Sequence, residues 1–209
     1  NVLNLLGLRV CSIARKFSDP LKDSRLDELE LSLGIKFNDR SLLVQATVHP
    51  SYLNESSKLG IIDYERLEYL GDAFLGWVVA LELYRSFPAY TEGQLTRARS
   101  LLVDRRNLNH VANDNELGKY LYLGHGEENT GGRKRQSNLA SVVESIIGAV
   151  LLDHGTDEAR KLILRWLGQA IMDLNVKGIP QDSKSAFQEW AQAGGFGLPV
   201  YRIVKEEGP

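Results

Sequence analysis

Apolar positions recur mainly at helical spacing along this 209-residue chain, and strand-like alternation is scarce. Leucines 26, 29 and 33 predict a short helix that ends at Gly34. Similar patterns and capping signals predict further helices at 41–48 after Asn38 or Asp39, 65–84, 94–103 after a Thr91/Gln94 capping box, 105–114 after Asp104, 137–153, from Thr156 onward, and 184–193 after Asp182. His49-Pro50 should end the second helix, the stretches 54–61 and 123–136 read as loops, and residues from 198 onward read as a strand. The pattern predicts an all-α fold.

Residues 65–84 read ERLEYLGDAFLGWVVALELY, in which three acids open an otherwise apolar helix. At ~100° per residue, positions i, i+3 and i+7 fall within roughly 60° of one another, so Glu65, Glu68 and Asp72 share one face. Like charges gathered in this way resist ionising together, which predicts a positive partner. The helix dipole alone also favours acids in a first turn. Beyond these acids the helix is apolar on every side except at Glu82, and such a helix is normally buried.

A second apolar helix, at 137–153, carries one charge between its ends, that of Glu144. Burying an unpaired carboxylate is costly. Both observations are explained if Glu144 faces Glu68 and Asp72, because the carboxylates then form a cage for a hard divalent cation such as Mg²⁺, with water completing its coordination. The sequence therefore predicts an acidic metal site between two helices.

The charge balance gives little information about partners. The formal net charge is −2, whereas nucleic-acid-binding domains usually show a basic surplus. Basic residues gather locally at Arg97, Arg99, Arg105 and Arg106, and again in the glycine-rich segment 131–135. Each cluster is explained either by phosphate contacts or by ordinary solvated surface.

The cysteine count, the lengths of the apolar runs and the N-terminal segment bear on where in the cell the protein is found. The one cysteine, Cys11, excludes internal disulfides and Cys-based zinc sites and favours a reducing environment. The apolar runs at 73–81 and 146–152 are shorter than a membrane span, so we expect no membrane association. Residues 1–17 contain basic residues and no acid, a balance found in organellar transit peptides and in flexible extensions.

The stretch ERLEYLGDAFL at 65–75 resembles the signature motif of the ribonuclease III family. Three further stretches resemble motifs of that family in the same order along the chain: TVHPSYLNE at 47–55, TEGQLTRARSLLV at 91–103 and NLASVVESIIGAVLLDHG at 138–155. The resemblance implies a bacterial, cytoplasmic endonuclease with an all-helical catalytic domain.

The implied organisation has four parts. An extension at 1–24 precedes the endonuclease domain at 25–175, and a linker at 176–181 follows it. Residues 182–209 are similar to the first half of an α/β double-stranded-RNA-binding domain. One helix and one strand cannot bury a core alone, so this last part is expected to be incomplete.

The resemblance also implies the chemistry. The family forms symmetric homodimers that bind double-stranded RNA between their subunits and leave staggered ends, as in the processing of ribosomal and other structured RNA. By motif position, Glu68, Asp72 and Glu144 correspond to ligands of Mg²⁺, for which Mn²⁺ can substitute. Asp72 and Glu144, with Glu65 as a supporting acid, correspond to catalytic residues.

Four further positions match the family. Glu92 corresponds to an acid near the cleavage site, and Tyr69 to an aromatic residue in the dimer contact, although a buried core tyrosine is an alternative. In the partial RNA-binding domain, Gln188 matches a helix position that reaches RNA, and Lys184 lies one turn away. A solvated helix surface is the alternative for Gln188.

One position departs from the family. Ser141 stands where an aspartate usually lies, three residues before Glu144. A serine can still hydrogen-bond water on a metal ion, but it attracts the cation less strongly. A catalytically weakened or inactive RNA-binding or structural homologue is therefore the second interpretation. A carboxylate-bridged di-iron protein would need Glu-x-x-His pairs, and the sequence has none.

Overall fold

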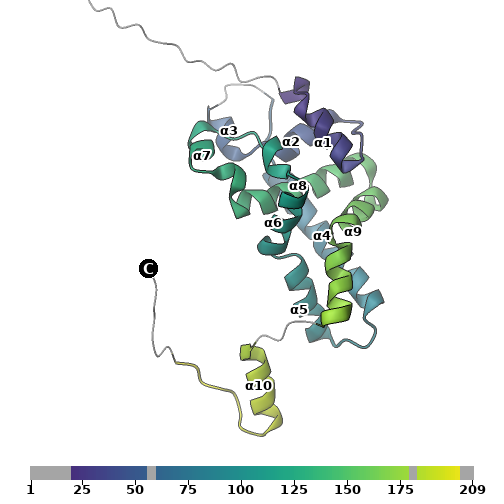
Figure 1. Ribbon diagram of the computed structural model, residues 1–209, viewed down its shortest axis with the longest axis vertical. Coiled ribbons are helices and arrows are strands. Elements are labelled where there is room, and N and C mark those ends of the chain that lie inside the picture. The colour runs from purple at the N-terminus through teal and green to yellow at the C-terminus, as the bar shows by residue number, and fades with distance from the viewer. Residues whose placement is uncertain (1–19, 56–59, 179–182, 203–209) are drawn as a thin grey trace, which may run out of the picture.

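A computed structural model describes residues 20–55, 60–178 and 183–202, and helices provide the regular structure of these segments (Figure 1). No β-strand forms within these segments, where an isolated bridge joins Val48 and Tyr122. The all-α prediction is therefore confirmed. In chain order the elements are η1 (Pro20–Lys22), α1 (Arg25–Leu33), α2 (Arg40–Thr47), α3 (Pro50–Glu55), α4 (Glu65–Ser86), α5 (Glu92–Leu102), α6 (Arg105–Asp114), η2 (Leu117–Tyr120), α7 (His125–Asn129), η3 (Gly132–Lys134), α8 (Gln136–His154), α9 (Thr156–Lys177) and α10 (Ser183–Ala193).

Local sequence signals set several helix ends. The carboxylates of Asp39 and Asp104 accept backbone N–H groups at the starts of α2 and α6. Thr91 and Gln94 form the predicted capping box before α5. Gly34 ends α1 in the left-handed conformation, at φ 62°. Among the described helices, none combines the length and apolar character that a membrane span requires.

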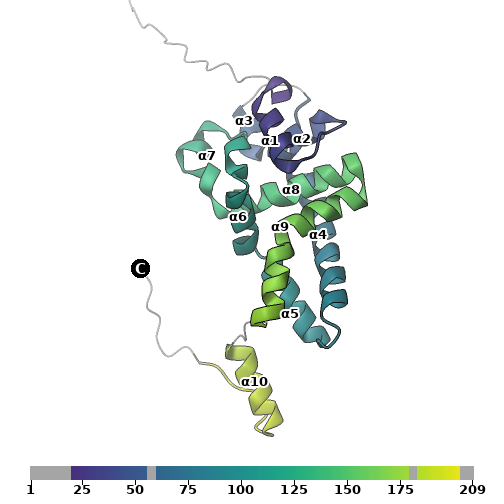
Figure 2. The same cartoon turned by 45° about the vertical axis from the view of Figure 1, so that its right-hand side comes forward.

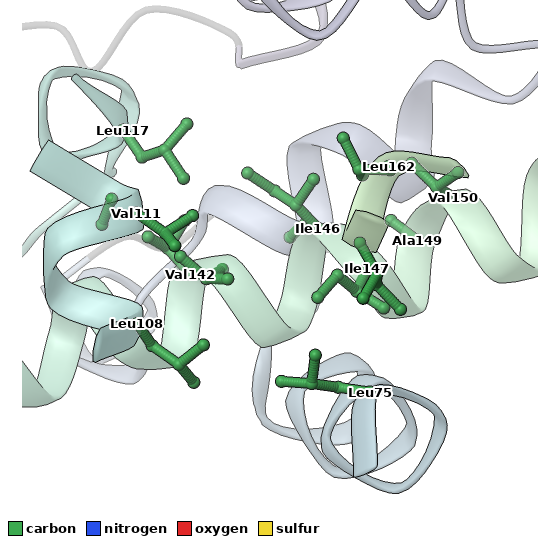
Figure 3. Packing of buried hydrophobic residues seen from close by; sticks show 14 of the residues in the cluster. Leu75, Leu108, Val111, Leu117, Val142, Ile146, Ile147, Ala149, Val150 and Leu162 are labelled. Carbon is green, nitrogen blue, oxygen red and sulfur yellow. The ribbon is translucent and has the colours of Figure 1, made fainter. Parts of the chain in front are cut away.

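Helix α8 lies in the middle of the bundle, with α4, α6 and α9 packed around it (Figures 2 and 3). Leu75 of α4, Leu108 of α6 and Leu162 of α9 meet Val142 and Ile147 of α8, and each of these side chains is at most 1% exposed. Burying one such side chain contributes roughly 1.5–3 kcal/mol to stability. This packing fixes the position of α8, and with it the position of every side chain that α8 carries toward its neighbours.

Two glycines allow α4 and α8 to cross with their backbones in contact. A Cβ atom on Gly71 would lie 1.8 Å from the carbonyl oxygen of Glu144. A Cβ atom on Gly148 would lie 2.3 Å from the carbonyl oxygen of Leu67. Both distances are far below van der Waals contact, so neither position has room for a side chain. The crossing therefore brings the acidic end of α4 beside Glu144.

The loop prediction for 123–136 is wrong in part, because this segment contains α7 and η3. The reason is tertiary. The backbone N–H of Gly124 donates to Ser51 Oγ at 2.9 Å, and that of His125 donates to Glu55 Oε2 at 2.7 Å. Residues 70 or more positions earlier thus stabilise the start of α7. Helix α2 ends at Thr47, just before His49-Pro50 as predicted, and Pro50 begins α3, a position where proline's missing N–H costs nothing.

The expectation that α4 is buried on all sides is also wrong. Tyr69, Trp77 and Tyr84 are 80%, 54% and 71% exposed and lie at helical spacing along one side. Leu75 and Leu83, at other positions around the helix, are fully buried. We call the exposed side of α4 its apolar flank. A helix that is apolar all round is thus only half covered within one chain.

At the C-terminal end, α9 extends to Lys177, so the linker predicted at 176–181 begins two residues too early. Helix α10 ends before Gly194, as predicted, but residues 198–202 form no strand, because no neighbouring strand in the described chain is available to pair with them. Outside the described residues lie the predicted linker residues 179–181, the Asp182 cap, the extension up to residue 19, and residues 203–209.

Candidate active site

The N-terminal half of α4, the middle of α8 and the start of α6 enclose a cleft of about 590 Å³. All four acids singled out from the sequence line this cleft. Glu65, Glu68 and Asp72 lie on about two turns of α4, and Glu144 lies on α8. The lining residues are Glu65, Glu68, Tyr69, Asp72, Val103, Asp104, Arg105, Ala140, Ser141 and Glu144. The structure therefore brings together residues that are more than 70 positions apart in the sequence.

The acids differ in exposure. Glu65 and Asp72 are exposed, whereas Glu68 and Glu144 are half-buried. The spacing of three and seven residues along α4 turns Glu65, Glu68 and Asp72 toward the same cleft, as the helical periodicity requires. The backbone contact at Gly71 then brings Glu144 to the opposite wall.

The environment of these acids opposes their ionisation. Burial raises the pKa of Glu144 to about 7, and the charges of Asp72 and Glu68 act in the same direction. Burial also raises the pKa of Glu68, while a hydrogen bond from Ser141 partly offsets this effect. The guanidinium of Arg105 acts to lower both pKa values, but its effect is smaller than the increase caused by burial and like charges. The cleft therefore favours a proton or a cation.

Ser141 contacts the acid cluster directly. Its hydroxyl donates a hydrogen bond to Glu68 Oε1 at 2.8 Å. This contact orients one oxygen of Glu68 across the two helices. Ser141 thus acts on a neighbouring carboxylate in this structure, in addition to any contact with water that its hydroxyl can make.

The donor set fits a hard divalent cation. Carboxylate oxygens and a hydroxyl are ligands that suit Mg²⁺, and the like charges of neighbouring acids add to the burial that raises the pKa values of Glu68 and Glu144. In the part of the chain that the structure describes, no three Asp, Glu, His or Cys side chains are already gathered as a complete metal-binding group. A cation bound here would draw the carboxylates together, and the exposed side chains of Glu65 and Asp72 can rotate toward it.

The other residues predicted to contact RNA lie elsewhere. Glu92 is the first residue of α5, is exposed and accepts a hydrogen bond from Thr96 Oγ1 at 2.8 Å, and it does not line the cleft. Gln188 is half-buried on α10. The side chain of Lys184 lies outside the described residues. Tyr69 is exposed and borders the cleft, so a core role within one chain is excluded.

Of the two basic clusters, one supports the fold. Arg133 pairs with Glu128 and donates to three backbone carbonyls, and Arg135 pairs with Glu127 at 2.6 Å. In the other cluster, Arg105 lines the acidic cleft. The sequence identified Arg105 only as part of a basic region, since nothing local indicates which arginine at the start of α6 faces α4.

Glu144 leads to a prediction about stability. Between its ordinary pKa of 4.5 and about 7, the folded protein retains a proton that the unfolded chain has lost, so stability must fall as the pH rises through this window. Above pH 7, and without divalent metal, Glu144→Gln should be more stable than wild type by roughly 1–3 kcal/mol, allowing for partial solvation. Urea unfolding in EDTA from pH 4 to 9 measures the difference. A constant difference across that range would contradict the assigned environment.

Known proteins are similar to this chain in sequence. A family model described as ribonuclease-III-like matches residues 39–171. The Ribonuclease 3 of Dehalococcoides mccartyi is 45% identical over 184 residues, covering 88% of this chain and 78% of that protein. The Ribonuclease 3 of Pseudomonas aeruginosa is 43% identical over 183 residues, covering 88% and 77%.

Solved structures give the same result. One is the nuclease domain of ribonuclease III from Campylobacter jejuni, whose description mentions structural flexibility in a region involved in dimer formation. It matches with a TM-score of 0.64 and 36% sequence identity, and the match covers 69% of this chain and 96% of that chain. Dicer from Pichia stipitis has a TM-score of 0.52 and 25% identity, covering 81% of this chain and 75% of its own. With a family model that matches well over half of its residues and curated relatives that align along most of its length, this chain belongs to the ribonuclease III family of endoribonucleases.

Proposed function

We propose that this protein is a divalent-metal-dependent endonuclease that cleaves both strands of double-stranded RNA and leaves staggered ends. The observation that carries the proposal is the cleft where Glu65, Glu68 and Asp72 of α4 face Glu144 of α8. Ribosomal precursors and other structured RNAs in a bacterial cytoplasm are the proposed substrates, in keeping with the bacterial relatives.

The acids have distinct proposed roles. Glu68, Asp72 and Glu144 hold Mg²⁺, or Mn²⁺ in its place, and Glu65 supports the cluster from the exposed side. When bound, the cation polarises the phosphate and lowers the pKa of water. Glu144 must lose its proton to take part, and the approach of a cation reverses the like-charge effect that raises its pKa. Ser141 holds Glu68 in orientation through its hydroxyl.

The deciding experiment is incubation of the protein with long double-stranded RNA, with and without Mg²⁺. We expect metal-dependent shortening to discrete duplexes, and little effect on single-stranded RNA of the same composition. Intact duplex at millimolar Mg²⁺ or Mn²⁺, with binding preserved, would instead support the second candidate, a non-cleaving RNA-binding homologue. Ser141 is the observation that favours this candidate, because it removes one acid from the cluster.

Ser141 provides a prediction that separates a weakened site from a lost one. Ser141→Asp adds a carboxylate beside Glu68, so it should lower the Mg²⁺ concentration for half-maximal cleavage by roughly 3- to 10-fold. Affinity for duplex RNA in Ca²⁺ should change little. Metal titrations of both proteins test this, with Ser141→Ala as the variant that removes the hydrogen bond to Glu68 without adding charge. An unshifted midpoint in Ser141→Asp would contradict a metal-site role for this position.

We further propose that the active form is a homodimer. The apolar flank exposes Tyr69, Trp77 and Tyr84 along α4, and Ile62 and Leu152 join Tyr69 around an adjacent cleft of about 600 Å³. A symmetric contact uses the same surface on both copies, which would cover this flank and place two cutting sites on one duplex. The Campylobacter jejuni nuclease-domain structure, whose description mentions a region involved in dimer formation, supports this assembly.

Trp77 tests the dimer. Trp77→Glu should raise the dimer dissociation constant by at least about 30-fold, because aromatic anchors carry much of an interface's binding energy and a buried charge opposes association. Sedimentation equilibrium at micromolar concentrations measures this. The matched control is Leu31→Glu, which alters an 82% exposed leucine on α1, outside the flank, and should leave the dimer intact. Equal behaviour of the two variants would place the interface elsewhere.

The residues after α9 have a separate proposed role. Helix α10 exposes Phe187 and Trp190, whose rings stack with centroids 5.6 Å apart, and Trp190 also stacks on Phe196. We propose that this segment belongs to a double-stranded-RNA-binding domain, with Gln188 and Lys184 facing RNA.

A further inference from the structure

Arg105 is unusual among the described residues that line the acidic cleft, because it is the one with a positive charge. Its side chain is exposed, and no hydrogen bond or ion pair joins its guanidinium to another described residue. By contrast, Arg133 and Arg135 of the other basic cluster are both paired with glutamates. An unpaired arginine beside several carboxylates requires an explanation.

The position of Arg105 is fixed by the fold. It is the first residue of α6, directly after the capping residue Asp104. One turn later, Leu108 is 1% exposed and packs α6 against Val142 of α8 (Figure 3). Val142 is the neighbour of Ser141, so the packing that anchors α6 also directs its first turn to the rim of the cleft. Arg105 is therefore held at the site without contributing to the core itself.

The electrostatic effect of Arg105 reaches both half-buried acids. Its charge lowers the pKa of Glu68 and that of Glu144. The guanidinium group of Arg105 nevertheless lies beyond ion-pair distance of the Glu68 and Glu144 carboxylates. A fixed cation at this place must weaken the binding of a divalent metal ion by repulsion. For the cleft to function with metal, a further negative group should neutralise Arg105.

A phosphate of the substrate has the required properties. A guanidinium binds phosphate oxygens in a bidentate manner, and the positive end of the α6 dipole adds to the attraction. We propose that Arg105 contacts a backbone phosphate of double-stranded RNA at the cleft, so that RNA and the divalent cation bind cooperatively. This inference rests on the proposed function. RNA neutralises Arg105 and thereby strengthens metal binding, and by thermodynamic linkage metal strengthens RNA binding equally.

The proposal predicts opposite effects on the two ligands. In Arg105→Ala without RNA, Mn²⁺ should bind about 2- to 5-fold more tightly by titration calorimetry, because a repulsive charge is removed. The same variant should bind a short RNA duplex in Ca²⁺ roughly 10-fold more weakly, since a charge-assisted phosphate contact is lost. Arg105→Lys should return the Mn²⁺ affinity most of the way to the wild-type value, because a lysine keeps the repulsive charge. It should restore only part of the RNA affinity, because a lysine loses the bidentate geometry.

The matched control is Arg106→Ala. Arg106 is the next residue of α6, is also exposed and does not line the cleft, so this variant changes the net charge by the same amount at an adjacent position of the same helix. Its effects on Mn²⁺ affinity should be smaller than those of Arg105→Ala. If the two alanine variants match in both titrations, Arg105 is ordinary solvated surface and the inference is overturned.

The outcome for wild type separates this inference from the proposed function. If wild type cleaves duplex RNA and Arg105→Ala behaves like Arg106→Ala, only the inference fails. If wild type does not cleave at any metal concentration, the proposed cleavage fails, and the two binding titrations still decide whether Arg105 couples RNA to the cation. Weaker Mn²⁺ binding in RNA-free Arg105→Ala would contradict the repulsion on which the inference depends.

Discussion

Glu144→Gln should reduce Mg²⁺-dependent cleavage of double-stranded RNA on the order of 10²- to 10³-fold while leaving the protein folded. The amide keeps the shape of the side chain on α8 and removes the charge that faces Asp72 and Glu68 across the cleft. Loss of one carboxylate that holds the cation removes several kcal/mol of charge stabilisation in the transition state. Single-turnover cleavage over a metal titration measures the effect.

The control for this variant is binding of the same RNA in Ca²⁺, which should change by less than about threefold because the proposed phosphate contact through Arg105 is retained. Glu82→Gln offers a second comparison, since Glu82 is a half-buried glutamate on α4 that pairs with Arg160 at 2.9 Å and lies away from the cleft. Undiminished cleavage in Glu144→Gln would remove Glu144 from the site. Equal losses in both variants would indicate a general structural effect.

Gly71→Ala should destabilise the fold by at least about 3 kcal/mol. The new Cβ would lie 1.8 Å from the Glu144 carbonyl oxygen and 2.9 Å from the Gly148 nitrogen, and both atoms belong to the α8 backbone. No side chain can move aside, so α4 and α8 must separate and lose packing along their length. Thermal unfolding should show a decrease in Tm of roughly 10 °C or more, or no folded protein.

Gly168→Ala is the matched control in α9. A Cβ there has no atom within 4 Å, so the same substitution should be neutral or should stabilise the fold by up to about 1 kcal/mol through helix propensity. A mild effect at Gly71 would mean that the two backbones do not cross in contact. The prediction also explains a residue of the signature stretch by packing, since Gly71 lies between Glu68 and Asp72 and has no side chain to offer the reaction.

Much of the helical framework follows from the sequence, because its signals are local. A capping side chain such as Asp39 or Thr91 acts on N–H groups two or three residues away, and Gly34 relieves strain at its own φ angle. The shared face of Glu65, Glu68 and Asp72 likewise follows from 3.6 residues per turn. These features are decided within about two helical turns, so tertiary packing does not alter them.

Contacts between distant segments are harder to predict from the sequence. The lone charge of Glu144 in an apolar helix indicated that it faces other acids, but the backbone contact at Gly71 and Gly148 establishes the approach. The helix at 125–129 forms because Glu55 accepts its first N–H groups, a contact between residues 70 positions apart. No local pattern encodes such a contact, so this stretch reads as a loop.

The sequence by itself determined most of the helices, several of their ends and the acids that share a face, since each of these depends on neighbours along the chain. Only the tertiary structure decided that Arg105 enters the acidic cleft and that one flank of α4 remains uncovered. The physical reason is that both depend on which face of a helix packs against α8. Burial fixes that choice through many small contacts between distant residues, and periodicity alone leaves it open.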